Sequence, residues 1–142
     1  MYTRILVPLE HSPADETILA HACELARRLG SKLVLLHVAD GWVARNIKEL
    51  NLRESEEMRE DRAYLEDISE RLQTEGFDAD AVLAAGDPAK EIAAAAEREG
   101  CDLIAMATHG HRLLDDVVHG STATALRHIT KIPILMVRAD KT

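Results

Sequence analysis

Residues 4–30 of the sequence are RILVPLEHSPADETILAHACELARRLG, and the pattern of this stretch is the main indication of the fold class. Residues 4–9 (RILVPL) form a short, almost continuously apolar run, which is typical of a strand covered on both faces. A helix start follows, with Ser12 predicted as the N-cap, Pro13 as the first helical residue and Asp15 as the partner in a capping box. Apolar residues then recur at helical spacing until Gly30 ends the helix. The stretch predicts one strand followed by one amphipathic helix.

The same unit repeats along the chain. We expect further strands at residues 32–39, 79–84, 101–107 and 133–138, and further helices at residues 55–75, 88–99 and 121–130. Residues 40–54 show no clean period and are predicted to form a loop. Strands that alternate with helices imply a parallel sheet with right-handed crossovers. The sequence therefore predicts a single α/β domain over residues 1–142, with helices on both faces of a five-stranded sheet.

Composition and charge argue against several classes of protein. The formal net charge is −8 and the basic residues form no run. Nucleic acid is therefore not expected as a partner, because phosphate binding needs clustered Lys and Arg. No apolar stretch approaches the roughly 20 residues of a membrane span, and no signal peptide is visible, so membrane insertion is not expected. Cys23 and Cys101 lie far apart in apolar segments, which favours reduced thiols in a cytoplasmic protein.

A candidate phosphate site follows the fourth predicted strand. The chain runs Ala107-Thr108-His109-Gly110 and, after nine more residues, Gly120-Ser121. In a doubly wound sheet, ligands bind beyond the carboxyl ends of the strands, where the strand order reverses. Gly110 lets the backbone approach a ligand closely, and a helix that opens at Gly120-Ser121 offers unpaired N–H groups to an anion. The alternative is that Gly120-Ser121 serves only as a helix cap.

These motifs together resemble the universal stress protein family, whose ATP-binding members carry Gly-x-x-Gly, nine residues, and then Gly-Ser or Gly-Thr. The present chain has Ala107 and Gly110, nine residues, and then Gly120-Ser121. The resemblance covers the whole chain, since four further segments are similar to strand ends of the family: residues 5–12, 35–38, 86–88 and 132–137.

The resemblance implies a Rossmann-like sheet of order 3-2-1-4-5, similar to the adenine nucleotide alpha hydrolases, and a site for ATP, ADP or AMP. Mg²⁺ would bind mainly through the phosphates and water. The residues implied to flank or contact the base are Pro8, Leu9, Glu10 and Val38. Those implied to hold the ribose and phosphates are Ala107, Gly110, Gly120, Ser121 and Thr122. His111 and Arg112 lie in the loop between them and are predicted, from position and charge, to add positive charge near the phosphates.

Two residues depart from the family pattern, and the last strand carries a further expectation. Ala107 replaces the first glycine of the motif, which predicts a slightly tighter fit, and Glu10 stands where the family usually has Asp near adenine. The segment Ile132–Val137 is apolar and would form a sheet edge, which is an aggregation risk unless it is covered. Pairing with the same strand of a second copy would cover it, and a homodimer through this strand is also what the resemblance implies.

Other constellations favour simpler interpretations. His109, His111 and His119 are close in sequence, but loop histidines are more often solvated than ligands of a transition metal. Ser12 and Ser121 lack a nucleophile elbow, and His37 is expected to be a hydrogen-bonded core residue. We expect a nucleotide-responsive binding protein in a stress response. The alternatives are a slow ATP hydrolase that uses Asp115, Asp116 or a histidine as base, and a nucleotide-free, chaperone-like interaction protein.

Overall fold

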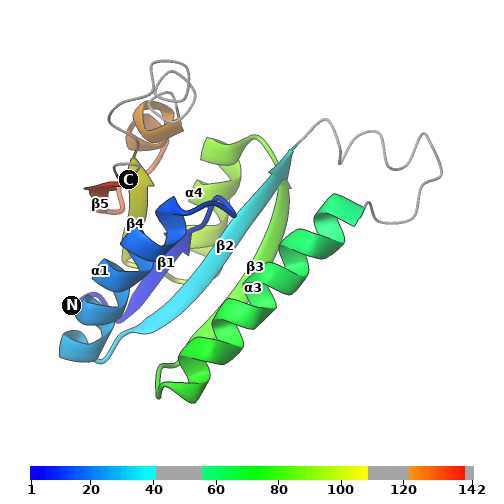
Figure 1. The fold of residues 1–142 in the computed structure, drawn as a ribbon. Coiled ribbons are helices and arrows are strands. Elements are labelled where there is room, and N and C mark those ends of the chain that lie inside the picture. Colours follow the sequence, from blue (N-terminus) through cyan, green and yellow to red (C-terminus); the bar gives the residue numbers. More distant parts are fainter. Residues whose placement is uncertain (41–55, 109–121, 140–142) are drawn as a thin grey trace.

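The computed structural model describes residues 1–40, 56–108 and 122–139. Five strands and three labelled helices alternate in this part of the chain (Figure 1). The strands are β1 (Arg4–Pro8), β2 (Lys32–Asp40), β3 (Ala79–Gly86), β4 (Leu103–Thr108) and β5 (Ile134–Arg138). The labelled helices are α1 (Ala14–Leu29), α3 (Glu56–Thr74) and α4 (Pro88–Arg98). Residues 122–129 are also helical. Of the predicted loop at residues 40–54, Asp40 instead ends β2, and residues 41–54 lie outside the described residues.

The five strands form one parallel sheet in the order β3-β2-β1-β4-β5. This order confirms the predicted fold class. The order reverses between β1 and β4, because the chain first builds outward through β2 and β3 and then returns to the other side of β1. In open α/β sheets such a reversal leaves a crevice at the carboxyl ends of the two central strands.

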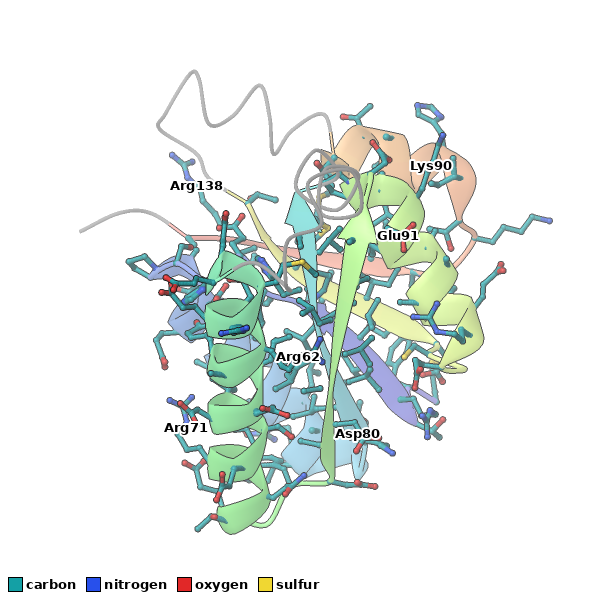
Figure 2. The ribbon with its side chains drawn as sticks, turned by 90° about the vertical axis from the view of Figure 1, so that its right-hand side faces the viewer. Arg62, Arg71, Asp80, Lys90, Glu91 and Arg138 are labelled. Atoms are coloured by element: carbon teal, nitrogen blue, oxygen red, sulfur yellow. The ribbon has the colours of Figure 1, made fainter. Side chains whose placement is uncertain are left out.

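Helices cover both faces of the sheet, and Figure 2 shows α3 and α4 on opposite sides of it. Side chains alternate along each strand, so Ile5 and Val7 pack with α1 and α3 while Leu6 packs with α4 and the helical residues 122–129. Burial on both faces explains why the central strands carry consecutive apolar residues, such as residues 5–7 of β1 and residues 33–36 of β2. The almost unbroken run RILVPL is therefore the sequence signature of the innermost strand, β1.

Several element boundaries differ from the sequence prediction by one or two residues, and two of them show a local cause. Pro13, not Ser12, is the N-cap of α1, and the helix begins at Ala14 without a side-chain cap. The carboxylate of Asp15 still accepts the Ser12 N–H (3.3 Å), so one half of the predicted capping box is present. Strand β4 begins at Leu103 rather than at Cys101, because Asp102 uses its side chain to hold the start of β1.

The outer strand β5 and the two cysteines complete the fold. β5 is an edge strand, as predicted, and its Met136 is 47% exposed. Cys101 is buried and Cys23 half-buried, and both are free thiols. Burial raises the pKa of Cys101 to about 11, so this thiol stays protonated near neutral pH. Within the described residues, none of the helices is both long and apolar enough to span a membrane.

The carboxylate of Asp102 joins the start of β4 to the start of β1 and makes the free energy of unfolding depend on pH. It accepts the backbone N–H groups of Thr3 and Arg4, both at 3.1 Å. Burial alone would raise the pKa of Asp102, but these hydrogen bonds outweigh it and the pKa lies below its usual value of 3.8. The stabilisation is therefore present above about pH 4 and is lost as the pH falls through the folded-state pKa.

We expect Asp102→Asn to lower the free energy of unfolding by about 1 kcal/mol at pH 7, because it removes the charge and one acceptor. The difference from wild type should shrink below about pH 4, where the carboxylate of the wild type becomes protonated. Urea unfolding between pH 3 and pH 7 measures this. Asp67→Asn, at an exposed position of α3, is the control. A gap between Asp102→Asn and wild type that stays constant across this range would contradict the assignment.

Candidate functional site

A pocket of about 220 Å³ opens at the carboxyl ends of the central strands. Its walls come from the ends of β1, β2 and β4, from the start of α4 and from the first residue of the helical segment 122–129. It therefore lies at the reversal of strand order, where the fold predicts a ligand site. The lining residues are Pro8, Leu9, Glu10, Leu36, His37, Val38, Pro88, Ile92, Met106, Ala107 and Thr122.

Six of the residues that the sequence analysis predicted as nucleotide contacts line this pocket: Pro8, Leu9, Glu10, Val38, Ala107 and Thr122. They come from four segments that are far apart in the chain, and the parallel sheet brings them to the same edge. The other nominated residues lie outside the described part of the structure: Gly110, His111, Arg112, Gly120 and Ser121.

Five of the residues that line the pocket were not predicted from the sequence. They are Leu36, His37, Pro88, Ile92 and Met106. Pro88 and Ile92 are four residues apart and share one face of α4, so the turn at Gly86-Asp87-Pro88 could have pointed to both. Leu36, His37 and Met106 carry no local signal beyond their position near a strand end. Their role as pocket walls depends on how far each strand extends past its neighbours.

The chain immediately after β1 is held by the buried carboxylate of Asp15, which is 1% exposed. This carboxylate accepts the N–H groups of Glu10 (2.8 Å) and His11 (2.9 Å) and the hydroxyl of Tyr64 (2.6 Å). Burial, assisted by the bond to Asp15, raises the pKa of Tyr64, so its phenol remains a neutral donor. The first turn of α1 and the middle of α3 thereby fix the pocket wall that carries Glu10.

His11 adopts a left-handed backbone conformation, with φ of 64°. Such a conformation costs about 1 kcal/mol in a residue with a Cβ, and it persists only where the surroundings hold it. Here the N–H of His11 donates to Asp15, and its ring stacks on Tyr64 with centroids 4.0 Å apart. These contacts hold the chain in this conformation beside Glu10, a residue of the pocket wall.

A second buried carboxylate, Asp61 of α3, lies between two imidazoles. Its Oδ1 is 2.7 Å from Nδ1 of His11, and its Oδ2 is 3.2 Å from Nε2 of His37. Nδ1 of His37 donates to the carbonyl of Leu9 at 2.8 Å. His37 is hydrogen-bonded, as predicted, but it is half-buried and lines the pocket instead of lying in the core.

The described residues provide a binding pocket rather than a nucleophile or a metal centre. The hydroxyl of Ser12 donates to the carboxylate of Glu10 (3.0 Å), so it braces the loop and is not paired with an imidazole base. No group of three or more His, Cys, Asp or Glu side chains within residues 1–40, 56–108 and 122–139 could hold a metal ion. The histidines 109, 111 and 119 lie outside these ranges.

The N-terminus of α4 lies at the pocket and is already capped. The carboxylate of Asp87 accepts the N–H of Lys90 (3.1 Å), so this helix end holds an anion of its own. The helical segment 122–129 reaches the pocket through Thr122.

Comparisons with known proteins agree with this architecture. The model of the universal stress protein family matches residues 1–138. A universal stress protein of Methanothermobacter thermautotrophicus is 31% identical over 145 residues, which cover 97% of both chains. Universal stress protein MJ0577 of Methanocaldococcus jannaschii is 26% identical across 97% of this chain and 96% of that protein.

Solved structures show the same likeness. The structure of MJ0577 superposes with a TM-score of 0.83 at 29% identity, covering 100% of this chain and 99% of the other. The universal stress protein of Archaeoglobus fulgidus in complex with dAMP shares the fold, with a TM-score of 0.70 at 19% identity over 96% of this chain and 98% of that one. On its sequence and its fold, the chain belongs to the universal stress protein family.

Proposed function

We propose that this protein binds ATP or a related adenine nucleotide at the carboxyl ends of its strands and acts as a nucleotide-responsive stress or regulatory protein. The main support for the proposal is that six residues predicted from the sequence as nucleotide contacts line a single pocket at the reversal of strand order. The Archaeoglobus fulgidus relative, solved with dAMP, supports an adenine nucleotide as the ligand class.

The chemistry of the walls orients the ligand. The end formed by Pro8, Leu9 and Val38 is largely apolar and suits a flat base, which loses little by leaving water. The carboxylate of Glu10 repels phosphate, so the phosphates extend away from it toward Thr122. There the glycines 110 and 120 give the backbone close access to the phosphates, with the hydroxyl of Ser121 as a donor.

In this proposal, residues between Gly110 and Gly120 balance the negative charge of the phosphates. His111 and Arg112 add positive charge, and Mg²⁺, where it is required, binds mainly to phosphate and water. Ala107, at the first position of the glycine motif, lines the pocket, and we expect its methyl group to make the fit slightly tighter without blocking the site. The capped N-terminus of α4 is not used, because the carboxylate of Asp87 already occupies it.

The proposal includes a homodimer that pairs the segment Ile132–Val137 with its copy. β5 is the edge of the sheet and leaves Met136 47% exposed, so a second β5 would cover an apolar edge and satisfy its backbone groups.

We also propose that the protein is cytoplasmic, because its two cysteines are free thiols, which suits a reducing compartment.

The nucleotide proposal is tested by filling the pocket. Val38→Trp places an indole against the proposed base site, and we expect the affinity for ATP to fall at least about tenfold, equivalent to about 1.4 kcal/mol. Isothermal titration calorimetry with ATP, ADP and AMP, with and without Mg²⁺, measures it. Leu29→Trp adds the same side chain at an exposed position on α1 and should bind as wild type does. Wild-type affinity in a folded Val38→Trp protein, or no binding by the wild type, would refute the proposal.

The dimer is tested at its edge. Met136→Lys introduces a charge into the proposed strand pairing, and we expect the dissociation constant of the dimer to rise by about tenfold or more because two lysines would face each other across the axis. Light scattering coupled to size-exclusion chromatography over a dilution series gives this constant. Leu29→Lys, at a similarly exposed apolar residue away from β5, should leave it unchanged. A monomeric wild type, or a dimer indifferent to Met136→Lys, would contradict the assignment.

A further inference from the structure

Three residues that are distant in sequence meet beside the pocket: Asp61 of α3, His37 of β2 and His11 in the turn after β1. Asp61 is 6% exposed, so its carboxylate depends on these partners for the interactions that water would otherwise supply. His37 is itself a lining residue of the pocket, whereas Asp61 is not. The group therefore connects α3 to the pocket through side chains.

The hydrogen bonds determine what His37 does. A carbonyl oxygen can only accept, so the bond to Leu9 requires a proton on Nδ1 of His37. Nε2 lies 3.2 Å from Oδ2 of Asp61. Both ring nitrogens thus face protein groups, and His37 holds the Leu9 carbonyl in place.

Asp61 reaches the same wall by a second route. Its other oxygen, Oδ1, binds Nδ1 of His11, the residue in the left-handed conformation. Leu9 and His11 are the two chain neighbours of Glu10, which is the acidic residue of the pocket wall. One buried carboxylate therefore holds the chain on both sides of Glu10, through His37 on one side and directly through His11 on the other.

We propose that Asp61 is a positioning residue for the pocket, which sets the place of Glu10 and the Leu9 carbonyl without contacting the ligand. The proposal rests on the proposed nucleotide site for its effect on binding, but its structural part is independent of any ligand. Small displacements of a binding wall reduce affinity because the contacts of a preorganised site depend on their geometry. Removal of Asp61 should therefore weaken binding even though the lining residues are all retained.

Two substitutions at position 61 separate positioning from simple destabilisation. Asp61→Ala removes the hydrogen bond to His11 and the contact with His37. Asp61→Asn retains groups for both, because its amide oxygen accepts from His11 and its amide nitrogen can donate to Nε2 of His37. Ser69→Ala is the matched control: Ser69 is a buried residue of the same helix, whose hydroxyl donates to the Ala79 carbonyl, and it does not line the pocket.

Calorimetry with ATP, ADP and AMP gives the first readout. We expect Asp61→Ala to weaken binding by about tenfold or more, Asp61→Asn to stay within about threefold of wild type, and Ser69→Ala to stay within about twofold despite its lost hydrogen bond. Wild-type affinity in Asp61→Ala would overturn the proposal. An equal loss of affinity in Ser69→Ala would also overturn it, because the effect would then follow from weakening α3 in general.

Nuclear magnetic resonance gives a second readout that needs no ligand. The Nδ1–H protons of His11 and His37 should be visible in wild type, because their hydrogen bonds to Asp61 and to the Leu9 carbonyl slow exchange with water. In Asp61→Ala the His11 signal should be lost, and the amides of Glu10 and His11 should exchange about tenfold faster than in Ser69→Ala. If the wild type binds no adenine nucleotide, the proposed function fails and this readout alone decides the positioning role. Unchanged amide exchange in Asp61→Ala would overturn that role.

Discussion

The parallel direction of all five strands is the constraint on which the site depends. Parallel strands bring every carboxyl end to the same edge of the sheet, and crossover helices must then cover both faces. Because the strand order reverses beside β1, the helices on the two sides of this point diverge and leave a pocket between them. The walls of the pocket are consequently built from the ends of β1, β2 and β4, together with the start of α4 and Thr122.

The pocket wall after β1 is supported by buried charge. Asp15 and Asp61 are both almost fully buried, and an isolated carboxylate in such a place would be strongly destabilising. Each is compensated by several donors: backbone N–H groups and a phenol for Asp15, and two imidazoles for Asp61. Networks of this kind contribute modestly to net stability, but they fix one geometry, since a displaced donor would leave a buried charge unpaired.

The proposed nucleotide site and the proposed dimer edge share one pair of strands. β4 contributes Met106 and Ala107 to the pocket and pairs in register with β5, where Met136 and Val137 stand opposite these two residues. A ligand that orders the end of β4 would therefore act on the strand directly bonded to the dimer edge. This proximity offers a physical basis for a binding protein whose assembly responds to its ligand, which is the behaviour required of a nucleotide-responsive regulator.

The sequence by itself determined the alternation of strands and helices, the burial of the strands on both faces and the edge at which a ligand would bind, because these follow from local periodicity and turn residues such as Gly30 and Pro88. The strand order came from resemblance to a family, and the structure confirmed it. Only the tertiary structure decided that Asp61 would meet His11 and His37, and that Ile92 and Met106 would join the pocket. Such contacts depend on the length of each strand and the packing of each helix. No pattern within a few residues of the chain carries that information.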